Sequence, residues 1–226
     1  MSLTISSVPG TFLALLDDAE RLALLELGAG REFARGAILM YEGEPGERVM
    51  VLASGRVKMT RIEPGGHETL LSICDPGDIL GELSLIDERP RLATVTALEP
   101  VRVLVITASV FRAHLERAPR VAIALLEVET RRFRETTLKL SQFLGSDTVG
   151  RLAARIVELS ERYGARREGE IEIGLALSQD ELAAWTGASR AGVAKAFQTL
   201  RKLGWIETHR RRLVVRELDA LRERAV

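Results

Sequence analysis

Short turn signals recur roughly every 9–12 residues between Glu32 and Ile106, and they constrain the fold of this 226-residue chain more than any other feature. The signals are Arg35-Gly36, Glu44-Pro45-Gly46, Ser54-Gly55, Pro64-Gly65-Gly66 and Asp75-Pro76-Gly77. Between them lie short runs rich in β-branched residues, a pattern typical of a small antiparallel sandwich or barrel. We therefore expect strands near residues 38–41, 48–53, 56–62, 68–73, 79–80, 93–98 and 101–106.

Composition excludes several classes of protein. Apolar residues make up 46% and charged residues 28%, as in ordinary globular proteins. The 32 basic and 32 acidic residues cancel, so any preference for a partner depends on where the charges lie. The single Cys74 forms neither an internal disulfide nor, alone, a cysteine-rich metal site. With no apolar run of membrane-spanning length and no signal peptide, we expect a cytoplasmic protein that contacts no membrane and holds no metal.

Apolar periodicity predicts a long helix over residues 119–144. It also predicts helices over residues 12–28 and 148–163. In the long helix, alternate steps of three and four residues form a seam. Its members are Ile123, Leu126, Thr130, Phe133, Thr137, Leu140 and Leu144. Such a seam favours a two-helix dimer interface, and the alternative is a helix packed on its own sheet. The polar Thr130 and Thr137 are expected to set the register or to meet a polar partner.

Two helices joined by a tight turn are predicted near the C-terminus. Ser178 and Glu181 form a capping box that begins a helix over residues 179–185. Gly187 permits the turn, and Ser189 caps a second helix over residues 190–203. Strands over 205–208 and 213–216 complete a winged helix-turn-helix, with His209-Arg210-Arg211-Arg212 at the tip of the hairpin.

Basic side chains concentrate in this segment. Residues 187–212 hold seven Lys and Arg against Glu207 alone. An arginine in the first half of a recognition helix can read guanine, and helix N-termini and wing arginines can bind phosphate. The candidate DNA-binding residues are Ser178, Ser189, Arg190, Gly192, Lys195, Arg210, Arg211 and Arg212. The alternatives are a solvated helix face and a winged helix that contacts protein.

Residues 81–95 combine an expected helical turn at Gly81-Glu82 with Arg91 ten residues later. Free backbone N–H groups and an arginine could hold one phosphate while a carboxylate accepts from a hydroxyl group. A sugar phosphate needs both features side by side. The alternative is a hairpin-like excursion with a surface ion pair. The sequence contains no recognisable catalytic constellation, so we do not expect an enzyme.

With these motifs in order, essentially the whole chain resembles the cyclic-AMP receptor protein/FNR family of bacterial transcription regulators. The resemblance implies an α+β protein with three parts. They are an antiparallel β jelly-roll of the cyclic-nucleotide-binding type at residues 1–118, a dimerisation helix at 119–144 and a winged helix-turn-helix domain at 145–226. It implies a homodimer that binds palindromic double-stranded DNA under the control of a small effector, and it also implies contact with RNA polymerase.

The resemblance also assigns residues to the effector. Glu82 would accept from a ribose 2′-hydroxyl, Arg91 would bind a cyclic phosphate, and Arg132 would pair with Glu82. Backbone N–H groups near Leu83 and at 92–93 would contact phosphate, and two threonines of the long helix would contact adenine. The full implied set is Gly81, Glu82, Leu83, Arg91, Leu92, Ala93, Arg132, Thr136 and Thr137. Cyclic AMP is therefore the expected allosteric ligand, with no further cofactor.

Two positions depart from the family pattern. Leu92 stands where bacterial cyclic-AMP binders carry Ser or Thr, a loss of roughly 1.5–3 kcal/mol if nothing compensates for the hydrogen bond. Ala191 replaces a glutamate of the recognition helix, which implies an altered half-site. The alternative is a regulator of the same family with another effector, or with none and a vestigial pocket.

Overall fold

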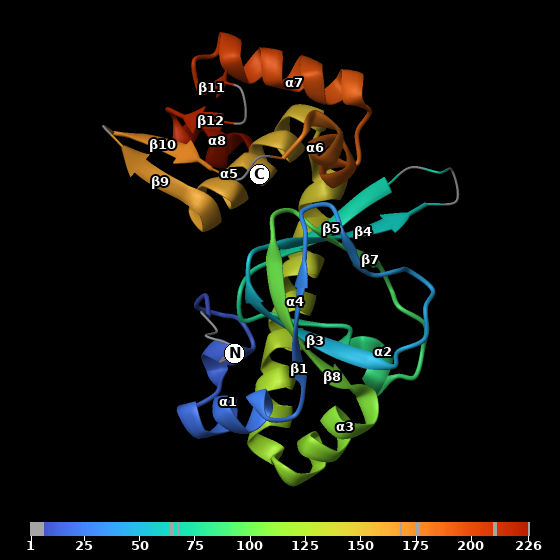
Figure 1. The fold of residues 1–226 in the computed structure, drawn as a ribbon. Coiled ribbons are helices and arrows are strands. Elements are labelled where there is room, and N and C mark those ends of the chain that lie inside the picture. Colours follow the sequence, from blue (N-terminus) through green and yellow to red (C-terminus); the bar gives the residue numbers. More distant parts are fainter. Residues whose placement is uncertain are drawn as a thin grey trace. The chain divides into compact units, whose positions relative to one another are not determined.

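The computed structural model describes residues 7–63, 66, 68–167, 169–174, 177–209 and 212–225 (Figure 1). Its chain forms two compact units, Met1–Phe133 and Arg134–Val226, and the division falls inside one long helix. Among the described residues, no helix is long and apolar enough to cross a membrane.

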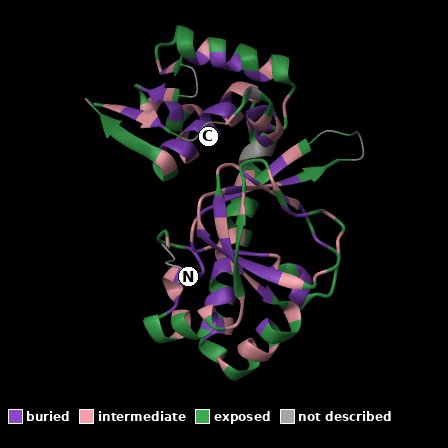
Figure 2. Ribbon diagram, viewed as in Figure 1, coloured by how far each residue is buried: buried purple, intermediate pink, exposed green. Residues whose placement is uncertain are grey.

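Two four-stranded antiparallel sheets form the core of the first unit. The strands of one sheet are, in order, β1 (Ala29–Phe33), β8 (Val101–Thr107), β3 (Arg48–Ser54) and β6 (Ile79–Leu80). Those of the other are β2 (Ile38–Met40), β7 (Thr94–Ala97), β4 (Val57–Ile62) and β5 (Glu68–Cys74). Apolar side chains from both sheets pack together, among them Met50, Leu52, Val57, Val95 and Val103. The predicted antiparallel jelly-roll is confirmed, and Figure 2 shows the buried strands at its centre.

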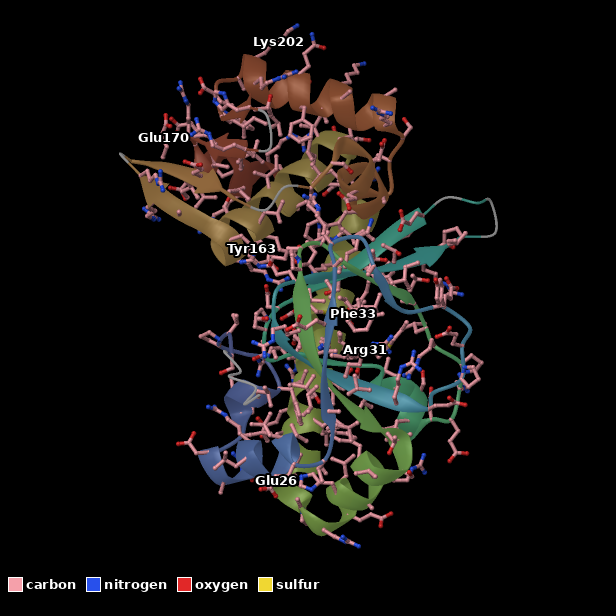
Figure 3. The ribbon with its side chains drawn as sticks, in the orientation of Figure 1. Glu26, Arg31, Phe33, Tyr163, Glu170 and Lys202 are labelled. Carbon is pink, nitrogen blue, oxygen red and sulfur yellow. The ribbon has the colours of Figure 1, made fainter. Side chains whose placement is uncertain are left out.

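The N-terminal helix predicted over residues 12–28 is wrong in extent. A 3-10 turn, η1 (Leu13–Leu15), comes first, and helix α1 covers only Asp18–Leu25. Leu16 is extended, and Asp17 caps α1 in a capping box with Glu20, so the helix begins there. After α1 the chain enters β1, an edge strand that the sequence analysis missed. Arg31 on this strand stacks 4.9 Å over the ring of Phe33 (Figure 3).

Three further helices complete the first unit: α2 (Glu82–Ile86), α3 (Ala108–Arg117), which was not predicted, and α4 (Pro119–Gly145), which continues into the second unit. One face of α4 is buried in a core cluster with Phe12 and Phe111. The buried residues of α4 are Val121, Ala124, Leu125 and Val128. They are different from the seam residues, so α4 has two separate apolar faces.

The seam of α4 is exposed in the single chain. Ile123 is 51% exposed, Leu126 66%, Phe133 73% and Leu140 58%. Thr130 and Thr137 are also exposed, while the side chain of Leu144 lies outside the described residues. The α4 residues that pack on the first unit are therefore not those of the predicted seam.

The second unit is built on α5 (Thr148–Tyr163), which packs against α6, α7 and α8. These helices cover Gln179–Thr186, Arg190–Lys202 and Leu218–Arg224. An antiparallel sheet has the order β11 (Ile206–His209), β12 (Arg212–Val215), β10 (Glu170–Ile173) and β9 (Gly164–Arg167). The predicted winged helix-turn-helix is present. Helix α8 was not predicted; its Arg224 donates to both carboxylate oxygens of Asp147, which caps α5.

Candidate functional site

Gly81 begins the candidate effector site. The chain leaves β6 and enters α2 through this residue, whose φ of +82° is costly for any residue with a side chain. A Cβ atom here would also lie 2.3 Å from Nη1 of Arg91. Glycine is thus required twice at this position, for its backbone conformation and for the close approach of an arginine.

Arg91 is buried at 5% exposure and is held by backbone carbonyl groups. Its Nη1 donates to the carbonyl of Gly81 at 2.6 Å, and its Nη2 donates to the carbonyl of Arg48. Backbone hydrogen bonds to Glu44 and from Gly43 fix the loop that carries it. Burial lowers the pKa of Arg91, and the nearby charge of Arg48 lowers it further. An arginine has five N–H donors, so bonds to two carbonyls leave it able to bind an anion.

Glu82 is buried at 4% exposure, and its two carboxylate oxygens have different surroundings. Oε1 accepts from Nη1 of Arg132 at 3.0 Å. Oε2 is buried and has no hydrogen-bond partner within the part of the chain that the structure describes. Burial raises the pKa of Glu82 to about 7, against the opposing charge of Arg132 and with a further rise from Glu129. A buried oxygen without a hydrogen-bond partner lowers the stability of the fold, so Oε2 is suited to accept a hydrogen bond from a hydroxyl group of a ligand.

Arg132 lies at the centre of a charged cluster. Besides Glu82, its Nη1 donates to Glu129 at 2.9 Å, and its Nη2 donates to Asp78 and to the carbonyl of Ile79, both at 3.2 Å. Burial lowers the pKa of Arg132, but the surrounding acidic groups outweigh it and raise that pKa above its usual value. Sequence reasoning anticipated the Arg132–Glu82 pair but missed Glu129 and Asp78. The spacing of three residues between Glu129 and Arg132 was the available signal.

The structure brings Gly81, Glu82, Arg91 and Arg132 together by the contacts above. The remaining candidates differ in exposure. Leu83 and Leu92 are 39% and 49% exposed, and Ala93 is buried. Thr136 and Thr137 are exposed residues of α4.

The helix-turn-helix has the local geometry that its sequence predicts. Ser178 Oγ accepts from the N–H of Glu181 at 3.1 Å, and the N–H of Ser178 donates to the Glu181 carboxylate at 2.8 Å. Gly187, with φ of +58°, ends α6. Ser189 Oγ then accepts from the N–H of Gly192 at 3.1 Å and caps α7. These contacts assign Gly192 to the first turn of the recognition helix.

One face of α7 is exposed to solvent. Arg190 and Lys195 lie on it, and Arg190 forms an exposed ion pair with Asp180 of α6 at 3.3 Å. The other side of α7 is buried through Val193, Ala196, Phe197 and Leu200. Sequence reasoning missed Gln198, which is exposed three residues after Lys195 and shares its face. Figure 3 labels Lys202 at the C-terminal end of this helix.

The wing is the antiparallel hairpin of β11 and β12, in which His209 pairs with Arg212. Arg212 lies 3.5 Å from the carboxylate of Glu172 on β10. Arg210 and Arg211, predicted at the tip, lie outside the described residues. Helix α5 packs against the helix-turn-helix. Its Arg151 donates to the carbonyl of Thr186 at 2.9 Å, and its Arg155 stacks 5.5 Å over the ring of Trp185.

No group of His, Cys, Asp and Glu side chains in the described ranges could hold a metal ion. Cys74 is buried, and its sulfur lies 3.6 Å from that of Met59.

Two parts of the chain match known domain families. Residues 30–118 match the cyclic nucleotide-binding domain, and residues 150–224 match the Crp-like helix-turn-helix domain. These stretches contain the Glu82–Arg91 site and the α6–α7 pair described above.

Relatives match across most of the chain. The CRP-like cAMP-activated global transcriptional regulator of Mycobacterium tuberculosis is 34% identical over 194 residues, which is 86% of this chain and 87% of that protein. The cyclic AMP receptor protein of Thermus thermophilus is 31% identical over 193 residues, 85% of this chain and 86% of that protein. Among solved structures, the c-di-GMP responsive global regulator CLP of Xanthomonas campestris has a TM-score of 0.79 at 21% identity, covering 88% of this chain and 99% of that one; this likeness concerns the fold alone.

Proposed function

The chain belongs to the CRP/FNR family of transcription regulators, which bind DNA through a helix-turn-helix and are not enzymes, and from this premise we propose that it is a homodimer controlled by cyclic AMP. One observation carries the choice of a cyclic nucleotide as the class of effector. A buried carboxylate with an open oxygen, Glu82, lies in the same short cassette as a buried arginine, Arg91.

Cyclic AMP offers the groups that these residues need. Its phosphate carries one negative charge, which Arg91 can bind, and its ribose keeps a free 2′-hydroxyl, which can donate to Glu82. Leu92 supplies no side-chain donor, so the phosphate relies on Arg91 and on backbone N–H groups. The relatives from Mycobacterium tuberculosis and Thermus thermophilus described above are both named for cyclic AMP, which supports the same ligand here.

The exposed seam of α4 supports a homodimer. Leu126 and Phe133 are 66% and 73% exposed in the single chain, and apolar side chains at such spacing are stabilised by a second helix. A twofold dimer presents two recognition helices. It therefore fits a palindromic site whose halves lie about 34 Å, or one helical turn, apart. Arg190 and Lys195 would read bases and Ala191 would alter the half-site, while Ser178, Ser189 and the wing arginines would contact phosphate.

The proposed mechanism is a shift between populations of the dimer. The effector favours the form whose recognition helices match the DNA spacing, to the extent that it binds that form more tightly. Such a regulator acts in the cytoplasm, together with RNA polymerase.

Calorimetric titration of the purified chain with cyclic AMP tests the effector. We expect micromolar binding by the wild type, none by Arg91→Ala, and retained binding by Arg89→Ala, which removes an exposed arginine of the same loop. Cyclic GMP and cyclic di-GMP serve as alternative ligands. Absence of heat with millimolar cyclic AMP would contradict the proposal, and binding of another nucleotide instead would favour a different effector.

A further inference from the structure

Three carboxylates surround one guanidinium group beside the effector site. Arg132 is within 3.2 Å of carboxylate oxygens of Glu82, Glu129 and Asp78. Its Nη1 is shared, at 3.0 Å from Glu82 Oε1 and 2.9 Å from Glu129 Oε1. Neither the pairing proposed for the family nor the DNA-binding role uses Glu129.

Negative charge exceeds positive charge in this cluster when every group is ionised. Glu82 is 4% exposed, so solvent screens it poorly. Two carboxylates that share one donor repel each other, and one proton between them removes the repulsion and adds a hydrogen bond. Burial raises the pKa of Glu82 to about 7, and Glu129 contributes to the rise. Burial likewise raises the pKa of Asp78.

We propose that Glu129 is a positioning residue of the effector site that shares both Arg132 Nη1 and a proton with Glu82, so that effector binding releases that proton. The inference rests on the proposed function, because the hydroxyl group that displaces the proton belongs to the nucleotide. Glu129 itself need not touch the ligand.

The other charged groups around Glu82 are consistent with the release of a proton from Glu82 when the effector binds. Asp78 precedes β6 and interacts with Arg132, and Cys74 at the end of β5 also influences the pKa of Arg132. Arg91 and Arg48 lie close enough for their charges to interact, and Arg91 also interacts with Glu82 and Glu44. An incoming phosphate therefore meets the charge of Arg91, which offsets its own negative charge. The new donor to Glu82 is the hydroxyl group, and it stabilises the ionised carboxylate.

The sign of the pH dependence follows. A ligand that lowers the pKa of Glu82 binds more tightly as pH rises toward the pKa of the free protein. Below about pH 7 the affinity should change by up to about tenfold per pH unit, and above it the affinity should level off.

The test is calorimetry of cyclic AMP binding in buffers of different ionisation enthalpy, with affinities measured from about pH 6 to pH 8. The wild type should release a proton near pH 7. Glu129→Gln keeps an amide oxygen for Arg132 but shares no proton, so the pKa of Glu82 should fall, less proton should be released at pH 7, and the affinity should level off at a lower pH than in the wild type. Glu116→Gln, which neutralises an exposed glutamate of α3, should behave as the wild type. Equal proton release by wild type and Glu129→Gln, or none by the wild type, would overturn the inference.

A second measurement separates this inference from the proposed function. If the wild type binds no cyclic nucleotide, the proposed function fails, and the predicted release on binding fails with it. The sharing of a proton is then tested in the free protein, by carbon NMR of labelled glutamate carboxyl groups followed as a function of pH. A glutamate titration near neutral pH in the wild type that moves to lower pH in folded Glu129→Gln would support the sharing. Titration of every glutamate below about pH 5 would refute it.

Discussion

Nη1 of Arg91 donates to the carbonyl oxygen of Gly81 at 2.6 Å and occupies the space where a side chain on Gly81 would begin. The left-handed turn and the buried arginine therefore determine each other's position. A phosphate would meet an arginine that the backbone has already placed, at little cost in side-chain entropy.

This relationship predicts that Gly81→Ala is unusually costly. It imposes both a positive φ and a clash with Arg91, so unfolding in urea should show a loss of about 1–3 kcal/mol and cyclic AMP affinity should fall. Gly36→Ala is the matched control, because Gly36 has almost the same φ, +81° against +82°, and a Cβ atom added there would meet nothing within 4 Å. Equal losses of stability in the two variants would contradict the role of the clash.

Glu82 should make the stability of the free protein depend on pH. Its folded-state pKa of about 7 lies above the ordinary value of 4.5, so the folded protein binds a proton more tightly than the unfolded chain. This contribution is complete below the unfolded pKa and is lost as pH rises through the folded one. In the wild type, the free energy of unfolding measured in urea should therefore fall as pH rises from about 4.5 to about 7, and in Glu82→Gln this fall should be smaller. An unchanged slope would show that Glu82 has an ordinary pKa.

Leu126→Lys should weaken the dimer without unfolding the monomer. Leu126 is 66% exposed in the single chain, so its replacement leaves the core intact but places a charge in the proposed seam. Sedimentation equilibrium should show a dissociation constant raised by at least about tenfold, for a loss of about 1.4 kcal/mol or more. Leu22→Lys, at a residue of α1 that is 63% exposed, should leave association unchanged. Equal association by both variants would place the interface elsewhere.

Asp180→Asn should tighten DNA binding. Asp180 holds Arg190 in an exposed ion pair and places a negative charge near the proposed DNA surface. The effect should be several-fold at low salt and smaller at high salt, measured by fluorescence anisotropy at fixed effector concentration. Asp219→Asn provides a control in α8, where the carboxylate pairs with Arg222 instead. Weaker binding by Asp180→Asn would mean that the pair orients Arg190 productively.

The accuracy of the sequence predictions depended on local signals. The bounds of α6 and α7 agree with expectation within one residue, because capping serines and glycines fix helix ends locally. The edge strand β1 was missed because four of its five residues are exposed, so it lacks the apolar alternation of a half-buried strand. Asp17 was read as part of a helix, although its side chain caps one.

The candidate site was predictable only where the cassette is contiguous. Gly81, Glu82 and Arg91 lie within eleven residues of each other, and a shared motif joins them. The cluster of Asp78, Glu129 and Arg132 is formed by packing of α4 on the first unit, and no spacing along the chain relates Asp78 to the helix. In the recognition helix, the position of Gln198 on the exposed face could have been predicted from its spacing of three residues from Lys195, although its uncharged side chain gave no signal.

The central claim is that cyclic AMP, bound at Glu82 and Arg91, controls DNA binding. The most direct measurement is the affinity of the dimer for an operator selected from random DNA, with and without cyclic AMP, at fixed salt. The account predicts that cyclic AMP tightens binding by the wild type at least about tenfold, or about 1.4 kcal/mol, and leaves Arg91→Ala unchanged. Equal affinity of the wild type with and without cyclic AMP would contradict it.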